Sequence, residues 1–132
     1  MNSEVIIIMG SEADRPFVAS ITAELTLLGI SYKEYVASAH KQPLKVLQIL
    51  QEHEKQSRLV YITVAGRSNA LSGFVAANSI APVLAVPPFA DKLDMLVNIH
   101  STLQMPSNVP VMTVLDPRNA ALAVQRILGV AQ

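Results

Sequence analysis

Val5-Ile6-Ile7-Ile8-Met9 is an uninterrupted apolar run near the start of the chain, and most of its residues are β-branched. Such runs are typical of strands that are buried on both faces, as the strands of parallel sheets are. A polar break at Gly10–Asp14 follows, and Pro16 then stands where a helix accepts proline in its first turn. A buried strand, a polar loop and a helix in this order form the repeating unit of a parallel α/β sheet.

The same unit recurs along the rest of the chain. Strands are expected at residues 5–9, 30–37, 59–64, 82–86 and 111–115, and helices at residues 16–28, from 43, at 71–78, from 91 and at 117–129. Gly29 and Gly129 are each typical of a helix end. The second strand is more polar, which favours a place near the sheet edge. We therefore expect one domain over residues 1–132 that is a three-layer α/β/α sandwich, flavodoxin-like or Rossmann-like, with right-handed crossovers.

Apolar residues at helical spacing indicate which helix faces are buried. The expected faces are Leu44, Leu47 and Leu50 in the second helix, Leu93, Leu96, Val97 and His100 in the fourth, and Ala120, Ala121, Val124, Ile127 and Leu128 in the last.

Composition narrows the function classes. The chain has 132 residues, of which 51% are hydrophobic and 15% are charged, whereas about 25% charged is usual. This favours a surface that meets other subunits. The formal net charge is zero and aromatic residues make up 5%, so nothing indicates nucleic-acid binding. No cysteine is present, which excludes a disulfide scaffold, a thiolate nucleophile and a cysteine-based metal site. No apolar run approaches the ~20 residues of a membrane helix, and we expect a soluble cytoplasmic protein.

Three polar loops, Gly10–Asp14, Ser38–Lys41 and Ala65–Asn69, each follow an expected strand. The carboxyl ends of parallel strands open on one edge of the sheet, where such folds bind their ligands. We therefore expect the three loops to lie side by side.

In the first loop, Ser11 can hydrogen-bond a phosphate beside a helix N-terminus. Asp14 can accept hydrogen bonds from ribose hydroxyls, but position alone favours a role as the helix N-cap. The loop is neither a P-loop nor a Gly-x-Gly-x-x-Gly loop.

His40 is the one histidine of three that lies in such a loop. Histidine titrates near neutrality and can both give and take a proton. Lys41 beside it is either a charge for phosphate or carboxylate, or a plain surface charge. His53 is expected near a helix end and is interpreted as a solvated residue or one matched to the helix dipole. His100 is expected within a helix and is interpreted as a packing or interface contact.

In the third loop, Arg67 can bind a carboxylate or phosphate through paired N–H donors. The alternative is a turn with a capping Ser68 or Asn69. The histidines are too widely spaced for a metal site, and no Gly-x-Ser-x-Gly elbow supports a serine triad.

Taken together and in order, the loops resemble the phosphoribosylaminoimidazole carboxylase family of purine biosynthesis. The resemblance covers nearly the whole chain and rests on Met9-Gly10-Ser11-x-x-Asp14, Ser38-Ala39-His40-Lys41, Ala65-Gly66-Arg67-Ser68-Asn69-Ala70-Leu71-Ser72-Gly73, Pro87-Pro88, Met105-Pro106-Ser107 and Asn119-Ala120-Ala121-Leu122-Ala123.

The family has two classes, and the third loop distinguishes them. The mutase class, which rearranges N5-carboxyaminoimidazole ribonucleotide, has a Gly/Ala-rich run followed by His-Leu-Pro-Gly. Here Ala70-Leu71-Ser72-Gly73 stands in that place, without the histidine. Together with Arg67 and Lys41, this resembles the class that takes up carbon dioxide directly.

The resemblance implies that aminoimidazole ribonucleotide (AIR) is carboxylated at C4 by carbon dioxide, reversibly, to 4-carboxyaminoimidazole ribonucleotide (CAIR). It implies His40 as proton shuttle, a homo-octamer, and no biotin, ATP or metal. The remaining roles that it implies are the 5′-phosphate for Ser11, Ser38 and Lys41, the ribose for Asp14, the carbon dioxide or carboxylate for Gly66, Arg67 and Ser68, and further pocket positions for Gly10, Ala65 and Asn69.

Two departures and two alternatives stand beside this interpretation. Ala13 replaces the second serine of the usual Gly-Ser-x-Ser-Asp loop, which removes a hydroxyl near the phosphate, and Arg15-Pro16 is also unlike the family pattern. The alternatives are the mutase and a non-catalytic ribonucleotide-binding module.

Overall fold

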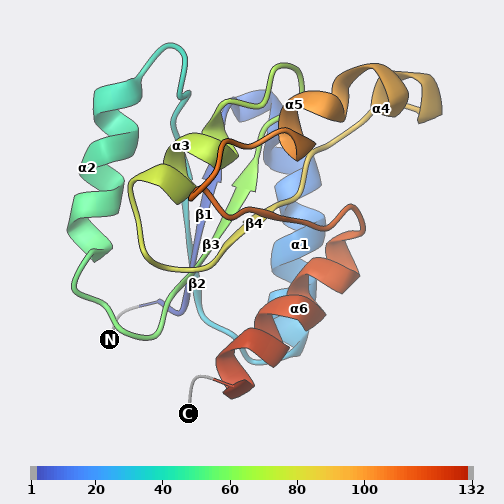
Figure 1. Ribbon diagram of the computed structural model, residues 1–132. Helices are drawn as coiled ribbons and strands as arrows, with labels where there is room; N and C mark the ends of the chain where they lie inside the picture. Colours follow the sequence, from blue (N-terminus) through green and yellow to red (C-terminus); the bar gives the residue numbers. More distant parts are fainter. Residues whose placement is uncertain (1–2, 131–132) are drawn as a thin grey trace.

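The computed structural model describes residues 3–130, and it places the apolar run that opens the chain inside a five-stranded parallel sheet of order β2-β1-β3-β4-β5 (Figure 1). The strands are β1 (Val5–Met9), β2 (Tyr32–Val36), β3 (Val60–Val64), β4 (Val83–Ala85) and β5 (Met112–Thr113). Every residue of β1 and β3 is buried, whereas β2 is more exposed and forms one edge of the sheet. The predicted parallel sheet and the edge position of the second strand are confirmed.

Helices cover both faces of the sheet. They are η1 (Glu12–Asp14), α1 (Arg15–Leu27), α2 (Pro43–His53), α3 (Leu71–Ala77), α4 (Lys92–Asn98), α5 (His100–Leu103) and α6 (Pro117–Val130). Alternate residues of β1 belong to two separate cores: Ile7 packs with residues of α1 and α6, and Ile8 with residues of α2 and α3. The alternation follows from the two-residue period of a strand, and the three-layer sandwich is confirmed.

Gly29 ends α1 as its sequence position predicts. Its φ is +70°, a conformation that glycine adopts without steric cost. The N–H of Gly29 donates to the Thr26 carbonyl at 3.0 Å and that of Ile30 to the Leu25 carbonyl at 3.0 Å, the two bonds of a Schellman motif. The corresponding prediction for Gly129 is wrong, because α6 continues to Val130.

Two predicted helix faces also differ from the structure. In α2 the buried residues are Val46, Ile49 and Leu50, while Leu44 is 72% exposed because it lies in the first turn, off that stripe. In α4 no residue is buried, and Leu93, Leu96 and Val97 are 62–70% exposed. This helix lies beyond the edge of the sheet rather than on a face of it (Figure 1). Within residues 3–130, no helix has the length and hydropathy that a membrane span requires.

Candidate active site

The three polar loops meet at the carboxyl ends of the strands, as expected. In register, Met9 of β1 lies opposite both Val36 of β2 and Val64 of β3, so the three strands end at the same level. A hollow of about 170 Å³ lies between the loops that follow them. It is lined by Gly10, Ser11, Asp14, Ser38, Ala39, His40, Ala65, Gly66, Arg67, Ser68, Ala70 and Leu71. Parallel pairing therefore gathers residues from positions 10 to 71 into one place.

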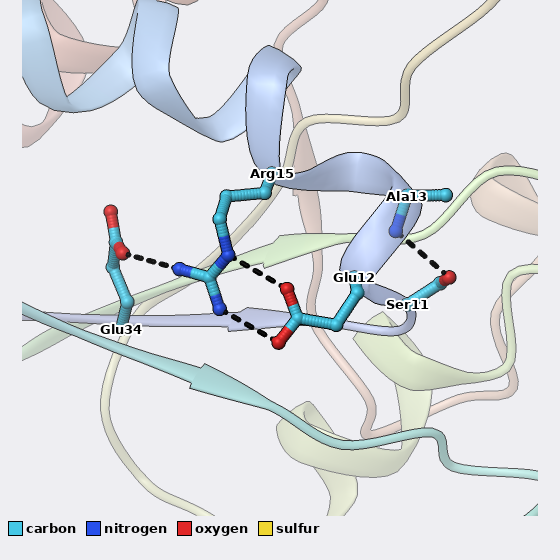
Figure 2. A network of polar contacts seen from close by, with 5 residues as sticks. All are labelled: Ser11, Glu12, Ala13, Arg15 and Glu34. Carbon is cyan, nitrogen blue, oxygen red and sulfur yellow. Dashed lines mark hydrogen bonds and ion pairs between the residues drawn. The ribbon is translucent and has the colours of Figure 1, made fainter.

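The first loop is held by a short capped turn and an ion-pair network (Figure 2). Ser11 Oγ accepts a hydrogen bond from the Ala13 N–H at 3.1 Å and so caps η1. The Arg15 guanidinium donates twice to Glu12, at 2.8 and 3.0 Å, and once to Glu34 of β2, at 3.2 Å. The hydrogen bonds from Arg15 hold the pKa of Glu12 below its ordinary value. Arg15, which the sequence marks only as a departure from the family pattern, thus ties the loop to the edge strand.

Asp14 precedes α1, but its carboxylate makes no capping hydrogen bond. The prediction that Asp14 caps the helix is therefore wrong for its side chain, and Ser11 makes the cap that this segment has. The Asp14 carboxyl lies at the hollow instead, half-buried, and burial raises its pKa. A carboxylate in this setting is available to a ligand with hydroxyl donors.

The second loop is a tight turn. The Gln42 N–H donates to the Ser38 carbonyl at 2.7 Å, and the Lys41 N–H donates to Ser38 Oγ at 3.2 Å. His40 is exposed at the tip of this turn and lines the hollow, while Lys41, also exposed, is not among the lining residues. The Ser38 hydroxyl still has its own hydrogen to donate, because it acts as an acceptor toward Lys41.

Among the residues that the structure describes, the third loop has backbone N–H groups beside the hollow that are not paired with a backbone carbonyl. Within residues 3–130, the N–H groups of Gly66, Arg67 and Ser68 donate to no backbone carbonyl. Ser68 has a φ of +49°, uncommon for a residue with a side chain and found most often at turns and functional sites. A Cβ at Gly66 would approach the Pro88 carbonyl only to 3.6 Å. Packing therefore leaves room for a side chain at position 66.

Asn69 is buried and serves the scaffold. Its Nδ2 donates to Thr102 Oγ1 at 3.0 Å, its Oδ1 accepts from the Ser72 N–H at 3.2 Å, and its own N–H donates to Ser101 Oγ at 2.8 Å. It lies outside the lining of the loop hollow. Of the two interpretations that the sequence allows, the capping one fits these contacts.

A second hollow, of about 450 Å³, adjoins the first and shares Asp14, Gly66 and Arg67 with it. Its other wall comes from the segment after β4 and from α4, with Phe89, Asp94 and Asn98. Arg67 Nη2 lies 3.8 Å from Asp94 Oδ1. Sequence reasoning missed Asp94 and Asn98, because they follow the fourth strand at a distance. The only signal there was Pro87-Pro88.

The remaining histidines and acidic residues form no comparable site. His53 contacts the Tyr35 hydroxyl at 3.0 Å and helps to line a hollow of about 730 Å³. The end of α2, the segment before β3 and the residues from the end of α3 to β4 surround this hollow. None of the loop residues named above lines it. In the part of the chain that the structure describes, no three histidine or acidic side chains gather as a metal site would require.

Comparison with known proteins gives consistent matches over nearly the whole chain. The AIR carboxylase family model matches residues 4–132. A protein named phosphoribosylaminoimidazole carboxylase, from Archaeoglobus fulgidus, is 49% identical over 126 residues, which are 96% of this chain and 69% of that protein. One named N5-carboxyaminoimidazole ribonucleotide mutase, from Pyrococcus horikoshii, is 36% identical over 126 residues, which are 94% of this chain and 71% of that protein. A crystal structure of PurE from Treponema denticola superposes with a TM-score of 0.89 at 42% identity, covering 97% of this chain and 81% of that one.

Proposed function

The chain belongs to the AIR carboxylase family, and we propose that it carboxylates AIR at C4 with carbon dioxide, reversibly, to give CAIR in purine biosynthesis. The observation that carries the proposal is the single hollow in which His40, Asp14 and the Gly66–Ser68 segment meet. These groups come from three separate loops. Together they supply a proton acceptor, an acceptor for hydrogen bonds from hydroxyl groups, and hydrogen-bond donors to an anion.

The reaction needs one bond made and one broken. C4 of the aminoimidazole ring is enamine-like and attacks the carbon of carbon dioxide, forming the new C–C bond. The C4–H bond then breaks, and His40 takes the proton as general base; in the reverse direction it returns the proton as general acid. Much of the acceleration comes from holding carbon dioxide over C4, for which positioning supplies on the order of 7–11 kcal/mol.

The third loop is suited to the carboxylate. The free N–H groups of Gly66, Arg67 and Ser68 would bind carbon dioxide or the new carboxylate, because preorganised donors favour the charge that develops there. The Arg67 guanidinium would add paired donors.

The other two loops would hold the rest of the nucleotide. Ser11, Ser38 and Lys41 would bind the 5′-phosphate, with Lys41 reaching it as a flexible cation from outside the lining. Asp14 would accept the ribose hydroxyls, and Gly10 and Ala65 would let the ligand approach the backbone. No biotin, ATP or metal is part of this proposal, because proton transfer and positioning complete the chemistry.

The choice of carboxylase over mutase rests on the third loop and on the comparisons. Ala70 stands where the mutase class has a histidine, and Arg67 accompanies it. Two relatives named carboxylase are 49% and 43% identical, while two relatives named mutase are 36% and 39% identical and other carboxylases fall to 37–38%. A non-catalytic ribonucleotide-binding module is the remaining alternative, and the retained His40 argues against it.

A homo-octamer in the cytoplasm completes the proposal. The exposed apolar side chains of α4, which include Leu93 and Leu96, together with the low fraction of charged residues, 15%, favour a surface that is covered by other subunits.

A spectrophotometric assay of the purified protein with AIR and bicarbonate, without ATP, tests the proposal. We expect turnover to CAIR, and turnover that required the N5-carboxy substrate would contradict the class assignment. His40→Asn is expected to lower kcat by about 100-fold or more, since general acid–base catalysis contributes 10²–10⁴-fold. The same variant should bind AIR within a few-fold of the wild type, as measured by calorimetry. Unchanged turnover would exclude His40 as the proton shuttle.

A further inference from the structure

Asp94 is a carboxylate that lies beside the site with both oxygens already hydrogen-bonded. Oδ2 accepts from the Ala90 N–H at 2.9 Å, and Oδ1 accepts from Asn98 Nδ2 at 2.6 Å. Its side chain is only 18% exposed. Asp94 is therefore fixed on α4, and its hydrogen bonds do not depend on Arg67.

Arg67, by contrast, is held loosely. Its Nη2 atom lies 3.8 Å from Asp94 Oδ1, and its side chain is 83% exposed. That separation is longer than a hydrogen bond, so the pair is a screened Coulomb contact of the kind that contributes little. If the guanidinium moves away, Asp94 retains a donor on each oxygen.

Arg67 also stands between the two hollows, because it lines both the one that holds His40 and the one that holds Asp94. A rotation of the Arg67 side chain can therefore move its guanidinium from one hollow to the other. A ligand carboxylate in the first hollow can offer charge-assisted bonds of about 2.7–2.9 Å, which Asp94 at 3.8 Å does not.

We infer that Asp94 is a specificity-determining residue: its carboxylate competes for Arg67 with the carboxylate of the carboxylated nucleotide. Asp94 pairs with the Arg67 guanidinium in the empty site and while AIR is bound. When CAIR is bound, the CAIR carboxylate replaces Asp94 as the partner of Arg67. The exchange lowers the affinity for CAIR selectively, so the carboxylated nucleotide is not trapped in a reversible reaction. This inference rests on the proposed function, and in particular on Arg67 as the carboxylate ligand.

Calorimetric titration with AIR and with CAIR tests this directly, in a His40→Asn background that prevents their interconversion. The two nucleotides share phosphate and ribose, so the ratio of their dissociation constants reports on the carboxylate. Asp94→Asn is expected to tighten CAIR about 3- to 5-fold, close to the most that an exposed ion pair allows, and to change AIR less than twofold. In an Arg67→Gln background, the effect of Asp94→Asn on CAIR should fall below twofold.

Asp91→Asn is the matched control. Asp91 lies one helical turn earlier, caps α4 by accepting from the Asp94 N–H at 2.8 Å, and forms no ion pair with Arg67. Its substitution removes the same charge from the same helix end. It should change the ratio less than twofold, and a change equal to that of Asp94→Asn would overturn the inference in favour of a general charge effect.

Asn98→Ala provides an independent variant of opposite sign, should Asp94→Asn fail to fold. It removes a donor from Asp94 Oδ1, so that oxygen should hold Arg67 more tightly. The affinity for CAIR should then fall several-fold, while the affinity for AIR stays unchanged. If both nucleotides bind but neither variant alters their ratio, the inference is wrong and the proposed function stands. If neither nucleotide binds any variant, including the parent, the proposed function fails and this inference fails with it.

Discussion

Asp14 shows how a site residue can weaken the fold that carries it. Its carboxylate makes no capping bond, and burial raises its pKa above the ordinary value of 3.8. The folded protein therefore holds the Asp14 proton more tightly than the unfolded chain does. Its contribution to the unfolding free energy falls as pH rises through the interval between 3.8 and the raised pKa. Above that interval, the ionised carboxylate carries its full desolvation cost.

Asp14→Asn is accordingly expected to raise the melting temperature at pH 7, because the neutral amide avoids the cost of burying a charge. The gain should shrink as pH is lowered through the interval and vanish below about pH 3.8. The same variant should bind AIR about 10- to 100-fold more weakly, since hydrogen bonds to charged groups contribute about 1.5–3 kcal/mol. Thermal unfolding against pH, with calorimetric titration, measures both. If the variant is less stable than the wild type at pH 7, the ionised Asp14 carboxylate does not destabilise the fold.

At the residue scale, the sequence correctly predicted where His40 and Gly66 lie, because the ends of the strands determine where their loops lie. The predicted locations of Lys41 and Asn69 were less accurate. Both stand in the right loops, but the course of the turn places Lys41 outside the lining and Asn69 in the core. Loop membership follows from sequence order, whereas the direction of a side chain depends on contacts with distant segments such as α5.

At the scale of elements, Asn69 joins the third loop to α3 and α5 through hydrogen bonds to Ser72, Ser101 and Thr102. Asn69→Ala would leave the buried Thr102 hydroxyl and the Ser72 N–H without these partners. We expect a loss of unfolding free energy on the order of 1–3 kcal/mol, measured by urea denaturation.

Ser68→Ala is the control, because Ser68 is the exposed neighbour in the same loop. It should change the unfolding free energy by less than about 0.5 kcal/mol. Equal losses for the two variants would show that Asn69 has no special structural role.

The types of the helices and strands were predictable because the spacing of the apolar residues and the positions of the residues that end an element indicate the same structure. The run Val5–Met9 is a buried strand and Gly29 ends a helix, each for a local reason. Gly129 and Leu44 show where local reasoning stops. A glycine near a helix end need not be its stop, and an apolar residue in a first turn need not face the core.

At the scale of the whole molecule, the apolar side chains of α4 are the feature that a single chain leaves unexplained. Leu93, Leu96 and Val97 are 62–70% exposed. Periodicity identified them as one face, but it could not show that this face turns away from the sheet. If subunits cover it, as the proposed octamer requires, a charge there should disrupt assembly without harming the fold of the chain.

Leu96→Glu is therefore expected to shift the protein to smaller species in sedimentation velocity, with its circular dichroism spectrum retained. Lys92→Gln, also exposed on α4, changes charge without apolar area and should sediment as the wild type does. Assembly of Leu96→Glu identical to that of the wild type would show that α4 is not an interface.

Isotope exchange between CAIR and bicarbonate tests whether carbon dioxide itself is the co-substrate. The protein is incubated with CAIR and ¹³C-bicarbonate, without ATP, and the carboxyl carbon of CAIR is followed by mass spectrometry beside a sample without protein. We predict from this proposal that ¹³C enters CAIR at a rate set by the protein and abolished in His40→Asn. Conversion of the N5-carboxy nucleotide to CAIR in the same solution, with no ¹³C in the product, would contradict it.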